Sequence, residues 1–140
     1  MSLAPLLQAS WIIQIHAFAA IAAFLLGASQ LALPKGTFRH RTVGWIWVTL
    51  MAIIAISSFF IHTICSFGGF SWIHALSILT LVTLPMAVAH ARAHRVTQHK
   101  RLMLILFFAA LVIAGIFTFV PGRIMHDVAF GGDAPHGMCA

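Results

Sequence analysis

Residues 11–33 read WIIQIHAFAAIAAFLLGASQLAL, a run of 23 residues without a charged side chain. A helix of about 20 apolar residues is long enough to cross the hydrocarbon core of a bilayer. Three further stretches have the same character, at 43–64, 70–91 and 102–120. The sequence therefore predicts four membrane-spanning helices.

The composition supports this reading. Of the 140 residues, 61% are hydrophobic and 7% are charged, whereas about 25% of the residues in a soluble domain are charged. The connections between the predicted spans are short, so each helix should lie antiparallel to the next. We expect one all-α integral membrane domain over 1–140, an up-down-up-down four-helix bundle of two pseudo-symmetric helical hairpins.

The basic residues predict an orientation. Seven of the eight lie in or beside the first and third connections: Lys35, Arg39, Arg41, Arg92, Arg95, Lys100 and Arg101. The positive-inside rule assigns these connections to the cytoplasm. We therefore expect a multi-pass protein of a bacterial inner membrane with both termini in the periplasm, and no cleavable signal peptide. The net charge of +6 reflects this arrangement and does not indicate nucleic-acid binding.

Histidines repeat along the chain. His16 and His74 each stand in the middle of an Ile-His-Ala tripeptide, 58 residues apart, and His40 and His99 lie 59 residues apart. An ionisable side chain within a membrane span is costly and is read as functional. The first pair falls near the outer surface and the second near the inner surface, each on two parallel, diagonally opposed helices.

Two facing imidazoles at each surface are what a b-type haem requires, because its iron takes two axial ligands from opposite sides. We predict His16 and His74 as ligands of an outer haem and His40 and His99 as ligands of an inner one. Basic side chains could neutralise the haem propionates: Arg39, Arg41, Arg92 and Lys100 at the inner surface and Arg123 at the outer. The predicted function is electron transfer, with a quinone or redox protein as partner.

Other uses of the histidines remain open. Copper or zinc could bind at the outer surface through His16, His62, His74 and His126, or at the inner surface through His40 and His99. Alternatively, the protein is a non-redox accessory subunit of a larger membrane complex, or a homo-oligomer, whose histidines are interfacial anchors or hydrogen-bonding groups. That simpler role is the preferred one for His90, His94, His99 and His136 when each is considered alone. In the haem hypothesis, His90 and His94 are rivals of His40 and His99 for the inner ligand positions.

Several functions find no support. No CxxC or CxxCH motif occurs, which argues against c-type haem attachment and a zinc ribbon. No predicted span carries a carboxylate, so proton-coupled transport and hydrolysis are disfavoured, and an enzymatic role is left open only as a redox component. Ser57, Ser58 and Ser77 are expected to bond back to helix carbonyls. Cys65 and Cys139 fall on the outer side, where a disulfide is permitted.

Several motifs are typical of one family: His16 in the first span, HRxxG (40–44), FSxxHxxS (70–77), His99 with Met103, and PGR (121–123). Through them, and over nearly its whole length, the chain resembles a family of small bacterial predicted membrane proteins known as a domain of unknown function. The resemblance implies a four-helix fold in the inner membrane and no established activity. The arrangement of the histidines also resembles that of di-haem transmembrane cytochromes b.

Overall fold

The computed structural model describes residues 3–61, 72–121 and 124–131. Within these ranges every regular element is helical, and four segments are long and apolar enough to cross a membrane. They are α2 (Trp11–Ala32), α3 (Phe38–Ser58), α4 (Trp72–Arg92) and a fourth arm composed of α5 (Val96–Ile105), η1 (Leu106–Ile113) and α6 (Ala114–Phe117). The predictions of an all-helical fold and of four helices long and apolar enough to span a membrane are confirmed for the described residues.

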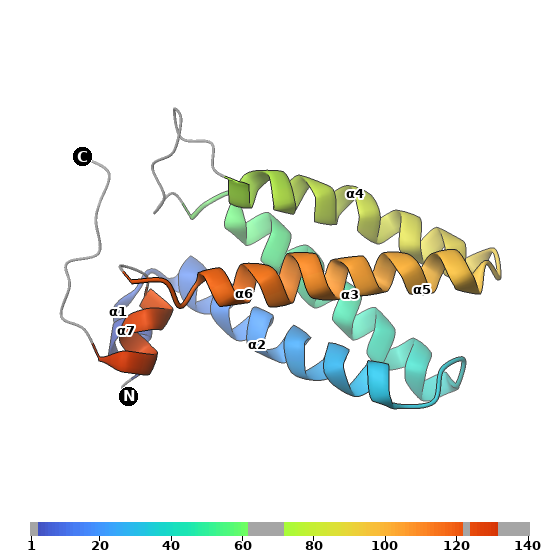
Figure 1. Ribbon diagram of the computed structural model, residues 1–140, viewed down its shortest axis with the longest axis horizontal. Helices are drawn as coiled ribbons and strands as arrows, with labels where there is room; N and C mark the ends of the chain where they lie inside the picture. The colour runs from blue at the N-terminus through green and yellow to red at the C-terminus, as the bar shows by residue number, and fades with distance from the viewer. Residues whose placement is uncertain (1–2, 62–71, 122–123, 132–140) are drawn as a thin grey trace.

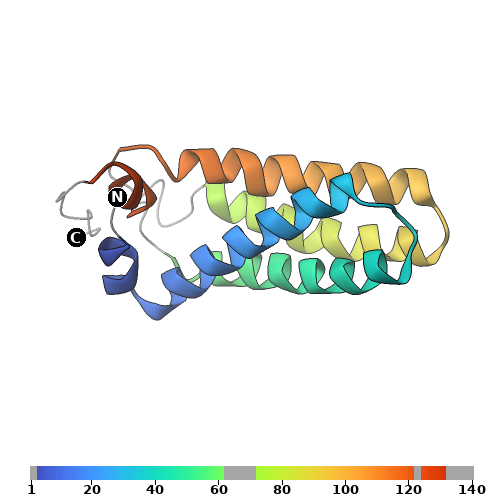
Figure 2. The ribbon, with the colours of Figure 1, turned by 90° about the horizontal axis from the view of Figure 1, so that it is seen from below.

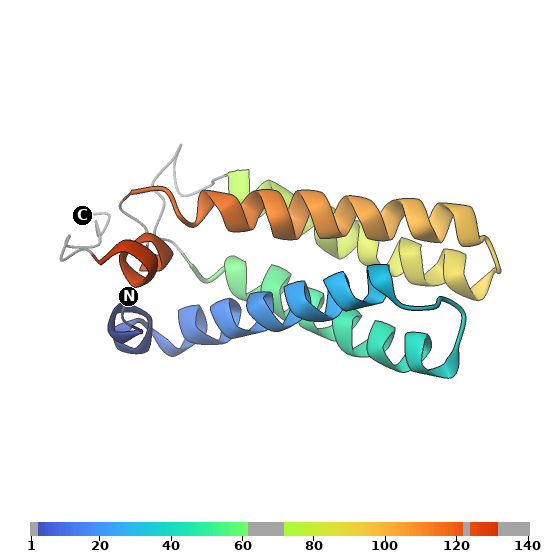
Figure 3. The same cartoon turned by 60° about the horizontal axis from the view of Figure 1, so that its bottom comes forward.

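The long helices form two layers, with α2 and α3 in one and α4 and the fourth arm in the other (Figures 1 and 3). The α2–α3 and α4–α5 connections lie at the same end of the molecule, which we name the turn end (Figure 1). At the opposite, terminal end, two short helices pack together, α1 (Ala4–Gln8) and α7 (Ile124–Phe130) (Figure 2). This contact buries Leu6 and Asp127.

Two helices begin earlier than the hydropathy indicated. Helix α3 begins at Phe38 because the Thr37 hydroxyl accepts a hydrogen bond from the His40 amide at 3.1 Å, an N-cap. The fourth arm begins at Val96, six residues before position 102. His40 and His99 therefore lie in the first turns of their helices and not in the connections before them. Hydropathy detects only the part of a helix that lies in hydrocarbon, so it misses a polar first turn.

The turn between α4 and α5 is closed by His94, whose φ is 57°. The Arg95 amide donates to the His90 carbonyl at 2.9 Å, and the His94 amide donates to the Ala91 carbonyl at 3.2 Å. This pair of bonds is the Schellman motif, in which the left-handed position is usually glycine. His94 thus ends α4 through its backbone.

The fourth arm is not a uniform α-helix, because its middle, η1, is a π-helix of eight residues. Hydropathy alone gave no indication of it. Single-turn π segments inside α-helices are often found at functional sites. Leu106, Phe107 and Leu111 of η1 are buried against the other spans.

The helices pack closely around Gly27 of α2. A Cβ atom at this position would lie 2.7 Å from the Phe107 ring and 2.8 Å from Trp47 Nε1. The Trp47 indole is itself fixed, because its N–H donates to the Ala23 carbonyl at 2.9 Å. Small residues at such contacts allow membrane helices to approach closely.

Candidate functional site

The buried face of α4 is polar. His74, Ser77, Thr80 and Thr83 follow one another at three-residue intervals, and each is less than 10% exposed. Ile78, Leu79, Val82 and Met86 of the same helix are exposed. Apolar side chains lose nothing by facing lipid, whereas polar side chains gain hydrogen bonds by facing other helices. Four polar side chains that are buried between the helices therefore lie on one face of α4.

Helix α3 meets this face with two hydroxyls. Ser58 Oγ donates to the Ala55 carbonyl at 2.7 Å and also contacts Ser77 Oγ of α4. Ser57 Oγ donates to the Ile54 carbonyl at 3.0 Å. The expectation that Ser57 and Ser58 bond back to helix carbonyls is confirmed. Both serines nevertheless use their second hydrogen-bonding capacity between helices.

His16 of α2 is held by Ser57 at 2.8 Å between Nδ1 and Oγ. With the Ser57 proton directed to the Ile54 carbonyl, the serine oxygen accepts and Nδ1 of His16 carries the hydrogen. In the neutral imidazole this leaves the lone pair on Nε2. A histidine oriented in this way, with Nδ1–H engaged and Nε2 open, has the arrangement common among metal ligands.

His16 borders a small interior cavity of about 60 Å³. Ser77 and Thr80 of α4 form part of its opposite wall, and Ala110 and Ala114 of the fourth arm contribute small side chains. The cavity is large enough for water. It is well below the roughly 300–1,000 Å³ of pockets that hold cofactor-sized ligands.

His74 lies three residues before Ser77, hence on the same face of α4 and one turn nearer the terminal end. Its imidazole is 6% exposed and packs against Phe59, with ring centroids 5.7 Å apart. His16 and His74, which we name the terminal-end pair, thus occupy the same region of the interior.

His40 and His99, the turn-end pair, are half-buried and lie near enough for their charges to interact. His99 Nδ1 lies 2.9 Å from the Ala87 carbonyl. Because a carbonyl only accepts, Nδ1 carries the hydrogen, and Nε2 of His99 is the open nitrogen, as in His16. The backbone carbonyl of His40 accepts from Gln30 Nε2 of α2 at 3.2 Å, which ties α2 to α3 at this level.

The remaining predicted residues lie elsewhere. Arg41 is exposed on α3. His126 lies on α7, where its Nδ1 is 3.4 Å from Asp127 Oδ1 and its ring contacts Phe130. In the described part of the chain, no three His, Cys, Asp or Glu side chains come together as a metal site. Five residues named in the predictions lie outside the described residues: His62, Cys65, Arg123, His136 and Cys139.

The sequence did not identify Thr80 and Thr83 as buried polar residues, and it did not identify the Ser57 hydroxyl as a partner of His16. A signal for the α4 residues was present, since polar residues recur every three positions from 74 to 83 inside an apolar span. Such a period places them on one helix face. No comparable signal links Ser57 to His16, because they belong to different helices.

These features define a class: an all-helical membrane protein with four spans and histidines at two levels of its interior. The chain belongs to the family described as "Predicted membrane protein (DUF2306)", whose model matches residues 13–132. Searches of the curated proteins and of the solved structures gave no match.

Proposed function

We propose that this protein is a b-type cytochrome of a bacterial inner membrane, an up-down-up-down bundle with both termini in the periplasm. The observation that supports the proposal best is the sorting of four histidines into two pairs near opposite ends of the bundle. Each pair takes one residue from each layer of helices. In His16 and His99 the Nδ1–H group is engaged, so that Nε2 is the nitrogen available to a ligand.

In this proposal the chain supplies four imidazoles, fixes their orientation and excludes water. Ser57 and the Ala87 carbonyl hold the rings of His16 and His99 by hydrogen bonds that also raise the basicity of the open nitrogen. A haem at each level would carry the electron between a quinone or redox protein at one surface and an acceptor at the other. Arg41 and Arg123 are the proposed propionate partners.

The packing at the terminal-end pair sets a condition on this proposal. A cavity of about 60 Å³ does not admit a porphyrin, so haem binding there requires α2 and α4 to separate. The same observation favours a second candidate, a non-redox accessory subunit whose histidines and hydroxyls join helices in place of binding a cofactor. Copper or zinc bound by the histidines is a further alternative, and a homo-oligomer or a larger host complex is compatible with each.

The deciding experiment is purification from haem-replete cells, followed by a dithionite-reduced optical spectrum, a haem-to-protein ratio and metal analysis. We expect about two haems per chain. His16→Ala or His74→Ala should remove one of them, and His40→Ala or His99→Ala the other. His90→Ala is the matched control and should leave both.

A protein without a Soret band would exclude the cytochrome and favour the accessory subunit. Stoichiometric copper or zinc in its place would assign the histidines to a metal site.

A further inference from the structure

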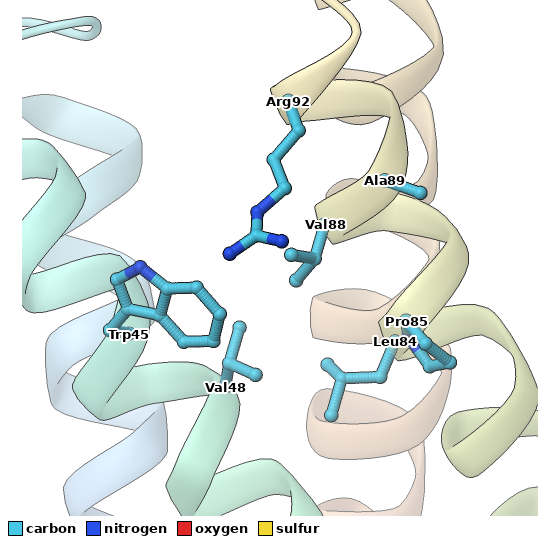
Figure 4. A pocket seen from close by; sticks show the side chains of 7 residues that line it. All are labelled: Trp45, Val48, Leu84, Pro85, Val88, Ala89 and Arg92. Atoms are coloured by element: carbon cyan, nitrogen blue, oxygen red, sulfur yellow. The ribbon is translucent and has the colours of Figure 1, made fainter.

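An open groove runs between α3 and α4 near the turn end, on a surface unrelated to the histidine pairs (Figure 4). Its volume is about 350 Å³. The apolar side chains of Val48, Leu84 and Val88 line it, and Trp45 and Arg92 stand at one end of it (Figure 4).

Pro85 and Ala89 of α4 also line the groove, and Figure 4 shows their side chains turned away from Trp45 and Val48 of α3, so neither fills the space between the two helices. Its surface is almost entirely apolar, so the preferred occupant of its length is a hydrocarbon chain.

Arg92 gives the groove a charged end. Its guanidinium carbon lies 5.9 Å from the centre of the Trp45 ring, a cation–π distance. Both side chains are exposed. The indole thus orients the guanidinium over the mouth of the groove while leaving its N–H donors free for an oxyanion.

Among the residues that the structure describes, no carboxylate lies near Arg92. Only two acidic residues occur in the sequence, Asp127 and Asp133. Asp127 lies on α7 at the terminal end, on the far side of the membrane thickness from Arg92 (Figure 1). The turn end carries six further basic residues: Lys35, Arg39, Arg41, Arg95, Lys100 and Arg101. This end of the described chain is therefore strongly basic and suited to an anionic ligand.

We propose that this groove binds one anionic phospholipid, with the phosphate at Arg92 and an acyl chain along Val48, Leu84 and Val88. Arginine pairs with phosphate through a planar fork of donors, and tryptophan is the side chain most suited to the headgroup level. Basic pockets between spans on the positive side of a membrane protein attract anionic headgroups. A neutral quinone would satisfy the apolar length but not the charge of Arg92.

The test uses the quenching of Trp45 by brominated lipids. The full-length protein in zwitterionic detergent is titrated with dibrominated phosphatidylglycerol or dibrominated phosphatidylcholine. The signal of Trp45 is taken as the difference between the wild type and Trp45→Phe. We expect phosphatidylglycerol to quench Trp45 at a lipid fraction about fivefold lower than phosphatidylcholine, the preference that one interfacial cation provides.

Arg92→Gln should remove that preference, whereas Arg92→Lys should keep most of it. Arg101→Gln is the matched control, since Arg101 is exposed at the same end but does not line the groove, and the preference should persist. Val88→Phe should fill the groove, because Val88 projects into it (Figure 4), and should weaken quenching by both lipids. Helical content and elution volume show whether each variant is folded.

Three outcomes would overturn the proposal. Equal quenching of the wild type by both lipids would show that no anionic site exists. An equal loss of preference in Arg92→Gln and Arg101→Gln would indicate a diffuse basic surface. Displacement of bound phosphatidylglycerol by an equimolar short-chain quinone would assign the groove to a quinone. None of these depends on whether the histidines bind haem.

Discussion

The two histidine pairs occupy similar places in the sequence but different environments in the structure. At the terminal end, His16 is oriented by a side chain, Ser57, beside a buried face of hydroxyls. At the turn end, His99 is oriented by the backbone carbonyl of Ala87, and His40 lies in a first helical turn capped by Thr37. The repeat in the sequence fixes the depth of each histidine, whereas the neighbouring helices determine which groups hold it.

His16 and His99 therefore differ in how easily a substitution can remove the hydrogen bond that orients the imidazole. The hydrogen bond that orients His16 can be removed by one substitution, because it depends on a serine hydroxyl. The support of His99 cannot be removed in that way, since every residue at position 87 carries a carbonyl. Substitutions near each histidine pair, and at a residue between the two pairs, can therefore show whether the two pairs respond independently.

The largest effect is expected at Gly27, which lies between the two levels. Gly27→Ala should lower the free energy of unfolding by about 1–3 kcal/mol, because the added methyl group meets the Phe107 ring and the fixed Trp47 indole. Denaturation in mixed micelles measures this. Gly115→Ala is the control, as no atom lies within 4 Å of its added Cβ, and it should be neutral or stabilising by up to ~1 kcal/mol. Equal costs at both positions would argue against close packing at Gly27.

A smaller effect is expected at the terminal-end pair. Ser57→Ala should cost about 0.6 kcal/mol and at most ~1.7, the range measured for hydrogen bonds between membrane helices. Ser29→Ala is matched to it, since Ser29 Oγ makes a similar bond to the Leu26 carbonyl on an exposed surface without a histidine, and its cost should be near zero.

If haem is bound, Ser57→Ala should also shift the reduction potential of one haem and leave the other unchanged. A shift of both potentials would show that the two levels are coupled.

An effect of similar size but opposite sign is expected in the α4–α5 turn, which precedes the helix that carries His99. His94→Gly should stabilise the protein by about 0.5–1 kcal/mol, because glycine adopts a φ of 57° without steric cost. His90→Gly, four residues earlier within α4, should destabilise it by a similar amount. Thermal unfolding of the two variants should therefore shift in opposite directions. Shifts of the same sign would contradict the role assigned to His94 in ending α4.

Much of the fold could be predicted from the sequence. Four apolar runs predicted four helices, and these occur, with α2 ending within one residue of its predicted limit. The helix starts at Phe38 and Val96 could not be placed by hydropathy, since their first turns are polar. The π-helix of η1 was also missed, because it is a property of backbone hydrogen bonding within an otherwise uniform apolar run.

The candidate site could be predicted only in part. Unusual polarity within apolar spans identified His16 and His74 as residues of interest, and their depth follows from the count along each helix. The partnership of Ser57 with His16 and the contact of Ser58 with Ser77 depend on how each helix is rotated about its axis. No spacing within a single helix encodes that rotation.

The sequence by itself determined the class of protein, the number of spans and the gathering of the basic residues in two connections. These are sums of transfer free energies and charges along the chain, so they do not depend on which helix lies beside which. Only the tertiary structure decided that Gly27 admits Trp47 and Phe107, that His16 and His99 leave Nε2 open, and that Arg92 stands over Trp45 at an apolar groove. Each of these depends on the distance between side chains of different helices, which is set by packing among all the spans together.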